Sequence, residues 1–193
     1  MKHIAKYISK HWEIPVVLGV ILLFTLLNLL HVMYYALKIP PHTVFIGITH
    51  WYEDYFYYLS QMTQGAMGAW KLVNRYTTEY IPLGYNWWFN LLLGKLTYVF
   101  PFSVWTIYDG SIAILSFVYM MIMYRVFQLL FPNERNLRIG GFLIAVTSTS
   151  FFKVVQTPAG YSIEPITYFY AYTLAFNRLG GVAHHIFLNI LKL

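Results

Sequence analysis

Residues 14–36 read IPVVLGVILLFTLLNLLHVMYYA, a run of 23 residues without a charged side chain. A helix needs about 20 consecutive apolar residues to cross the hydrocarbon core of a bilayer. The run is longer than the apolar part of a signal peptide, and no small-residue cleavage site follows it. Lys2, Lys6 and Lys10 precede it, and basic flanks favour the cytoplasmic side of a span. The sequence therefore predicts a cytoplasmic basic end at 1–13 and a retained first span at 14–36.

The composition of the whole chain is typical of a membrane protein. Of its 193 residues, 59% are apolar and 10% are charged, whereas a soluble domain has roughly 25% charged residues. The net charge is +6, but the bases stand singly between apolar runs. This spacing suits anionic lipid better than the basic stripe or arm of a nucleic-acid-binding protein. We therefore expect an integral protein of the cell (plasma) membrane with membrane lipid as a partner, and we exclude soluble enzymes and nucleic-acid-binding modules.

The rest of the chain alternates polar and apolar segments. Residues 37–85 are too polar to span and are predicted to form an external loop, in which 53–73 form an amphipathic helix along the membrane interface. Apolar runs follow at about 86–100, 104–131, 139–152 and 166–176, and the Pro- and Gly-marked residues 156–165 are predicted to be a loop. A last apolar stretch ends at Leu193. The predicted fold is all-α: a polytopic integral membrane protein with one transmembrane domain over 1–193 and about four to five hydrophobic helices.

The run at 86–100 creates a conflict in this topology. If it spans, the alternation of spans places Arg125, Arg135 and Arg138 outside, against the tendency of basic residues to stay inside. Either the run is re-entrant, or these bases have an external role such as holding phosphate. No cysteine is present, which excludes disulfides and cysteine-based metal sites or nucleophiles.

Glu53 and Asp54 are adjacent carboxylates at the start of the expected interfacial helix. Acidic residues suit the positive end of a helix dipole. A carboxylate at a membrane interface is costly unless it is solvated or used. Such a group accepts a proton from an attacking hydroxyl or binds a hard divalent cation. The alternative is that both residues only cap the helix and face water.

The order of these features resembles the GT-C superfamily of membrane glycosyltransferases, which includes protein O-mannosyltransferases, aminoarabinose transferases and oligosaccharyltransferases. In that family a cytoplasmic N-terminus and one span lead into a large external loop with a D-x-D, E-D or D-E motif, followed by interfacial helices. The matching residues here are Glu53 and Asp54 in YEDY, followed by YYLSQMTQGAMGAWKLVNRYTTE over 57–79. PLG at 82–84 and the apolar run to LGKL at 93–96 resemble the family's second span. Residues 40–95 resemble uncharacterised bacterial members.

The resemblance implies an inverting glycosyltransferase of the hexosyltransferase type. It would move a sugar from a polyprenyl-phosphate donor to an acceptor hydroxyl at the external membrane face. Asp54 would be the catalytic base or a metal ligand, with Glu53 its partner, and a divalent metal ion would be the cofactor only in the second case. Positive groups would stabilise the departing lipid phosphate. The candidates for binding the substrate are Lys71, Arg75 and Arg178, together with His50 and His184, for which an ordinary interfacial histidine is the alternative.

Two points set this chain apart from the family. Members usually have more spans, and this chain ends in the apolar stretch HHIFLNILKL, so we expect it to be the N-terminal part of a longer protein, with the alternative that this short chain holds half of an active site and is inactive. The rival hypothesis is a non-catalytic membrane subunit or part of a transporter, with Lys95, Asp109 and Arg125 lining a path. A transporter needs charges at mid-membrane between repeated halves, and the sequence has no internal repeat. We otherwise expect Asp109 to pair with Lys95 as a structural ion pair.

Overall fold

The computed structural model describes residues 12–43, 52–79, 88–147, 152–158, 160–165 and 182–193, and within these ranges the chain is mostly helical. The elements follow in this order: α2 Glu13–Leu37, α3 Tyr52–Ala66, α4 Trp88–Lys95 with a 3-10 turn at Leu96–Tyr98, α5 Val104–Leu130, α6 Arg135–Thr147, strands β1 Phe152–Thr157 and β2 Gly160–Pro165, and α9 Ala183–Lys192.

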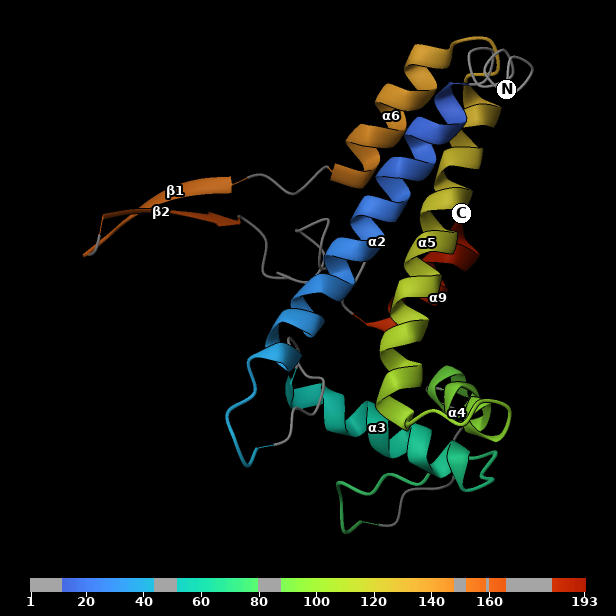
Figure 1. Ribbon diagram of the computed structural model, residues 1–193, viewed down its shortest axis with the longest axis vertical. Helices are drawn as coiled ribbons and strands as arrows, with labels where there is room; N and C mark the ends of the chain where they lie inside the picture. The colour runs from blue at the N-terminus through green and yellow to red at the C-terminus, as the bar shows by residue number, and fades with distance from the viewer. Residues whose placement is uncertain (1–11, 44–51, 80–87, 148–151, 159, 166–181) are drawn as a thin grey trace.

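The two long helices, α2 and α5, lie side by side and run in opposite directions (Figure 1). The Ser103 side chain accepts a hydrogen bond from the Thr106 backbone N–H at 3.2 Å and so caps the start of α5. In the described ranges, α5 is the one helix whose length and composition suit a membrane crossing; the apolar segment Glu13–Leu27 of α2 is shorter. The predicted boundaries 14–36 and 104–131 agree with α2 and α5 to within a residue at each end.

A buried core joins α2 and α5 to α6 and α9. Val17 and Ile21 of α2 pack with Met120 of α5, Phe142 of α6 and Ile186 of α9, and all five are at most 2% exposed. The outer side of α2 is different, because a group of large apolar residues is about half exposed: Leu22, Leu23, Leu26, Leu30 and Met33.

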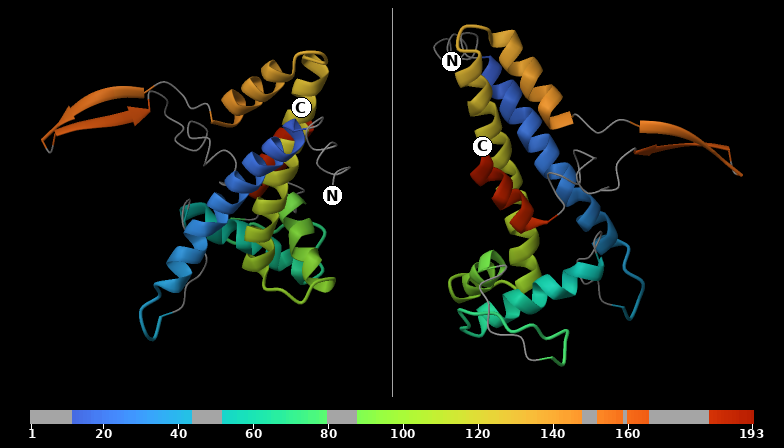
Figure 2. Two further views of the ribbon diagram at one scale, coloured as in Figure 1. Left: turned by 45° about the horizontal axis from the view of Figure 1, so that its top comes forward. Right: turned by 180° about the vertical axis from the view of Figure 1, so that it is seen from behind.

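Helices α3 and α4 form a layer across the end of the long pair (Figures 1 and 2). Tyr55, Tyr58 and Met62 of α3 are buried against α4, the start of α5 and the start of α9. The predicted helix over 53–73 is therefore present but ends at Ala66. Gly68 adopts a φ of +93°, a conformation that glycine accepts readily and that ends many helices.

The long pair and α6 meet at the opposite end. The Arg138 guanidinium donates two hydrogen bonds to the Glu13 carboxylate, at 3.0 and 2.9 Å. Arg135 lies 3.9 Å from the same carboxylate and over the Trp12 ring. The contact joins residues 125 positions apart and places the start of α6 beside the start of α2.

Two of the predicted apolar segments need correction. Within the run at 86–100, residues 88–98 form an eight-residue helix followed by a 3-10 turn, and eight residues reach only about 12 Å. Residues 139–147 of the run at 139–152 belong to α6, which has 13 residues and a length of about 20 Å, and Phe152 begins β1. Both helices are shorter than the roughly 30 Å of a bilayer core. The run at 166–176 lies outside the described residues.

The predicted loop at 156–165 is wrong, because a two-stranded sheet occupies most of it. The described part of the chain is mostly helical, as predicted, with this hairpin added. Strands β1 and β2 pair antiparallel, with Lys153 opposite Glu164 and Val154 opposite Ile163. The hairpin projects from the helices (Figure 1). Gly160 at the turn has a φ of +125°, which favours glycine. Pro158 and Gly160 mark the turn. The β-branched residues on either side of it, such as Val154 and Ile163, favour strands.

Candidate functional site

The α3 layer carries the acidic motif. Asp54 lies in the first turn of α3 and is exposed, where the helix dipole favours a carboxylate. The next residue, Tyr55, points the other way and is 5% exposed. Glu53 belongs to the same turn, its side chain lying outside the described part, as does the whole of His50. The helix thus turns its aromatic face inward and leaves Asp54 accessible.

The segment that follows α3 folds back along it. The Gln64 side chain makes two hydrogen bonds with the Val73 backbone: its amide N–H donates to the carbonyl at 3.0 Å, and its oxygen accepts from the N–H at 2.9 Å. Further along, the ring of Tyr76 lies edge-on to Tyr57, with centroids 5.5 Å apart. Tyr57 is one helical turn from Asp54. The fold therefore returns the chain from the end of α3 toward the acidic end.

This return brings the predicted cations into the same layer. Lys71 and Arg75 are both exposed, and Arg75 precedes the Tyr76 that packs on Tyr57. The sequence pointed to Lys71 and Arg75 by charge alone. It did not single out Gln64, the residue that fixes the return, because a polar residue within an amphipathic helix gives no sign of its distant partner.

Beneath the exposed layer lies a buried aromatic cluster. The Tyr55 ring meets Tyr108 of α5 edge-on at 5.6 Å, and Tyr58 stacks on Tyr108 at 6.3 Å. His184, at the start of α9, meets Tyr58 with a centroid distance of 5.0 Å and is 3% exposed. The predicted substrate-binding residue His184 thus lies in a packed position that fixes α9 against α3.

Burial determines the protonation of this cluster. Burial raises the pKa of Tyr55 above its ordinary value, and the nearby charge of Asp109 raises it further. The phenol therefore stays neutral. The pKa of His184 is lowered to about 3, mainly by burial and to a smaller extent by the charge of the adjacent His185. Because an unperturbed histidine titrates near 6.5, His184 is neutral over the physiological range.

Helices α3 and α4 approach each other closely through glycines. A Cβ added to Gly94 would lie 1.9 Å from the Met62 carbonyl oxygen, and one added to Gly65 would lie 2.2 Å from that of Leu91. Next to this contact, the Asn90 amide donates to the Gln61 side-chain oxygen at 2.7 Å, and both residues are buried. Small residues of this kind allow close helix packing in membranes.

Lys95 does not form the expected pair with Asp109. Its ammonium lies 4.0 Å above the ring centroid of Trp70, a cation–π contact that holds the end of α4 to the segment after α3. The prediction treated Lys95 as an intramembrane charge in need of a counter-ion. In the α3–α4 layer, Lys95 interacts with the aromatic ring of Trp70 in place of a carboxylate.

The structure tests the metal expectation only within the described residues. These contain no group of three or more His, Asp or Glu side chains that could hold a metal ion, and the side chain of Glu53, the predicted partner of Asp54, lies outside them. Arg178, the last predicted site residue, lies outside the described residues.

Comparisons of the chain with models of protein families, with curated proteins and with solved structures found no match.

Proposed function

We propose that this chain is a GT-C-like glycosyltransferase, in which α2 and α5 cross the bilayer and α3 and α4 lie at the external interface. The observation that carries the proposal is the long helix pair with its transverse layer. With 25 and 27 residues, α2 and α5 measure about 37 and 40 Å, enough for the roughly 30 Å hydrocarbon core with tilt. The half-exposed leucines of α2 suit lipid better than water.

The Glu13–Arg138 contact supports one orientation. It places Arg135 and Arg138 beside the start of α2, and the sequence that precedes this start is basic. Basic residues near the ends of spans favour the cytoplasm, so the N-terminus and the start of α6 would be cytoplasmic and the α3 layer external. If the short α4 does not span, the alternation of spans places Arg125, Arg135 and Arg138 on the inner side, in agreement with the tendency of basic residues to stay inside.

The arrangement of charges favours a transferase over a transport path. Residues 110–124 of α5 carry no charge, whereas a transport path needs charged groups near mid-membrane. Asp109 lies near the start of α5 and Lys95 in the α3–α4 layer. The charges of the described spans thus gather toward the two ends.

In the proposed reaction, the exposed layer around Asp54 works at the membrane surface. The donor is a sugar on a polyprenyl phosphate, which reaches the layer from within the bilayer. The Asp54 carboxylate accepts the proton of the acceptor hydroxyl, and the hydroxyl oxygen attacks the anomeric carbon as the bond to the phosphate oxygen breaks, with inversion. Arg75, whose planar guanidinium matches phosphate oxygens, and Lys71 offset the negative charge that develops on the leaving lipid phosphate.

The test is sugar transfer in sealed lipid vesicles that contain the chain and a mixture of labelled polyprenyl-phosphate sugars. We expect label to pass to an acceptor, and Asp54→Asn to reduce the rate by about 100-fold or more, the usual contribution of a general base. Glu134→Gln removes an exposed carboxylate at the opposite end and should leave the rate unchanged. Absence of transfer by the unaltered, membrane-inserted chain, or equal activity of Asp54→Asn, contradicts the proposal.

A further inference from the structure

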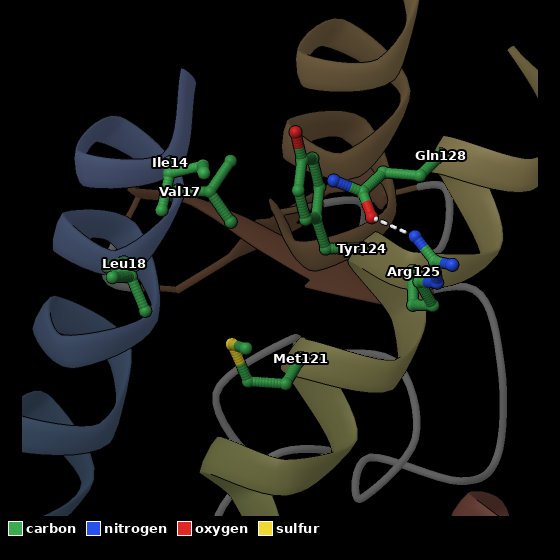
Figure 3. A pocket seen from close by; sticks show the side chains of 7 residues that line it. All are labelled: Ile14, Val17, Leu18, Met121, Tyr124, Arg125 and Gln128. Atoms are coloured by element: carbon green, nitrogen blue, oxygen red, sulfur yellow. Dashed lines mark hydrogen bonds between the residues drawn. The ribbon is translucent and has the colours of Figure 1, made fainter. Parts of the chain in front are cut away.

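A groove runs between α2 and α5 near the Glu13–Arg138 end. Its walls are Ile14, Val17 and Leu18 on α2 and Met121 and Tyr124 on α5, and it encloses about 230 Å³ (Figure 3). Val17 forms its floor at 2% exposed, while Ile14 and Met121 on the rims are 41% and 39% exposed. The groove is therefore an apolar furrow that opens on the outside of the helix pair.

One charged side chain stands at this groove. Arg125 is exposed, and its guanidinium donates to the Gln128 side-chain oxygen at 2.9 Å (Figure 3). Gln128 is neutral, and the ion pairs among the described residues join Glu13 to Arg135 and Arg138. The charge of Arg125 is thus not compensated by a carboxylate within the described part of the chain, and four of its five N–H donors remain for other acceptors.

The depth of Arg125 suits a lipid headgroup. It lies five residues before the end of α5, or about 8 Å along the axis. A long arginine side chain at that depth reaches the headgroup region while its stem stays among apolar groups. The apolar furrow then lies on the membrane side of the cation, where an acyl chain would run.

We propose that this groove binds an anionic phospholipid of the cytoplasmic leaflet, with the phosphate on Arg125 and an acyl chain between α2 and α5. Gln128 orients the guanidinium, and the apolar walls exclude water from beside the chain. The bound lipid fills the furrow and couples α2 to α5 at the end where Glu13 joins α6. This inference rests on the membrane placement in the proposed function and not on its transfer step.

Native mass spectrometry of the chain released from nanodiscs tests the proposal, with phosphatidylglycerol and phosphatidylcholine as the competing probes. We expect the unaltered chain to retain phosphatidylglycerol preferentially. Arg125→Gln should reduce that preference about five-fold, the effect of one basic residue near an anionic surface. Leu18→Trp should reduce retention of the lipid by filling the groove.

Two matched variants serve as controls. Lys38→Gln removes an exposed positive charge at the opposite end of α2, and Leu23→Trp adds the same bulk on another, exposed face of that helix. Both should retain phosphatidylglycerol as the unaltered chain does. Equal retention by Arg125→Gln and the unaltered chain, or an equal loss in Lys38→Gln, overturns the inference. Failure of the chain to enter the nanodisc bilayer instead contradicts the membrane placement itself, so the two failures are distinguishable.

Discussion

Replacing Gly94 with alanine tests the close packing of α3 on α4. The new Cβ would lie 1.9 Å from the Met62 carbonyl oxygen, and real Cβ atoms essentially never approach closer than 3.0 Å. The two helices must therefore separate locally by about 1 Å, because the atom opposite is backbone and cannot rotate away. The hydrogen bond from Asn90 to Gln61 is 2.7 Å long and buried, and the same shift would stretch it past the range of a hydrogen bond.

These effects give the size of the expected loss. Overpacking costs about 1–3 kcal/mol, and leaving a buried amide unsatisfied costs about 1–3 kcal/mol. The helix preference of alanine over glycine returns about 1 kcal/mol. We expect Gly94→Ala to lower the free energy of unfolding by about 3 kcal/mol, or the midpoint by about 6–12 °C for a chain of this size.

Thermal unfolding in detergent micelles, followed by circular dichroism, measures this change. Gly110→Ala is the matched control, because a Cβ there meets nothing within 4 Å and the substitution should leave stability unchanged or raise it by about 1 kcal/mol. An unfolding midpoint of Gly94→Ala equal to that of the unaltered chain would refute the packing described for α3 and α4.

Two further predictions concern charged and titratable groups. Glu13→Gln should destabilise the fold by about 3 kcal/mol, since it leaves the Arg138 side chain, which is 13% exposed, without its charged partner. The same change at the exposed Glu134 should have no effect, and equal unfolding midpoints for the two variants would contradict the role of the pair. The lowered pKa of His184 means that the unfolded chain binds a proton there more readily than the folded chain between about pH 6.5 and 3. This contribution is present above pH 6.5 and falls with pH, by about 2 kcal/mol between pH 7 and pH 5, so chemical unfolding curves of His184→Gln should show a flatter pH dependence; parallel profiles would count against the burial of His184.

The sequence predicted the long helices well because their signal is local. Length and continuous apolarity set α2 and α5 to within a residue, and Pro132 follows the end of α5. The same signal failed at 86–100, where Leu91 and Leu93 of the short helix α4 are buried by packing on neighbouring helices, whereas the outer leucines of α2 are half exposed. Hydrophobicity alone does not distinguish these two environments.

The candidate site was only partly predictable for a related reason. Asp54, Lys71 and Arg75 stand out by residue type, but their common layer depends on Gln64 holding Val73 and on Tyr76 packing against Tyr57. The approach of Arg138 to Glu13 likewise joins distant positions. Contacts of this kind depend on the tertiary fold, and local patterns in a single sequence do not predict them.

The central claim is that α2 and α5 cross the bilayer with Glu13 and Arg138 inside and the α3 layer outside. Because the chain has no cysteine, single cysteines at the exposed positions Thr78 and Asn133 report on the two ends without background. In intact cells treated with a membrane-impermeant maleimide, we expect Thr78→Cys to be labelled at once and Asn133→Cys only after the membrane is permeabilised. Labelling of both positions from the same side would contradict the account.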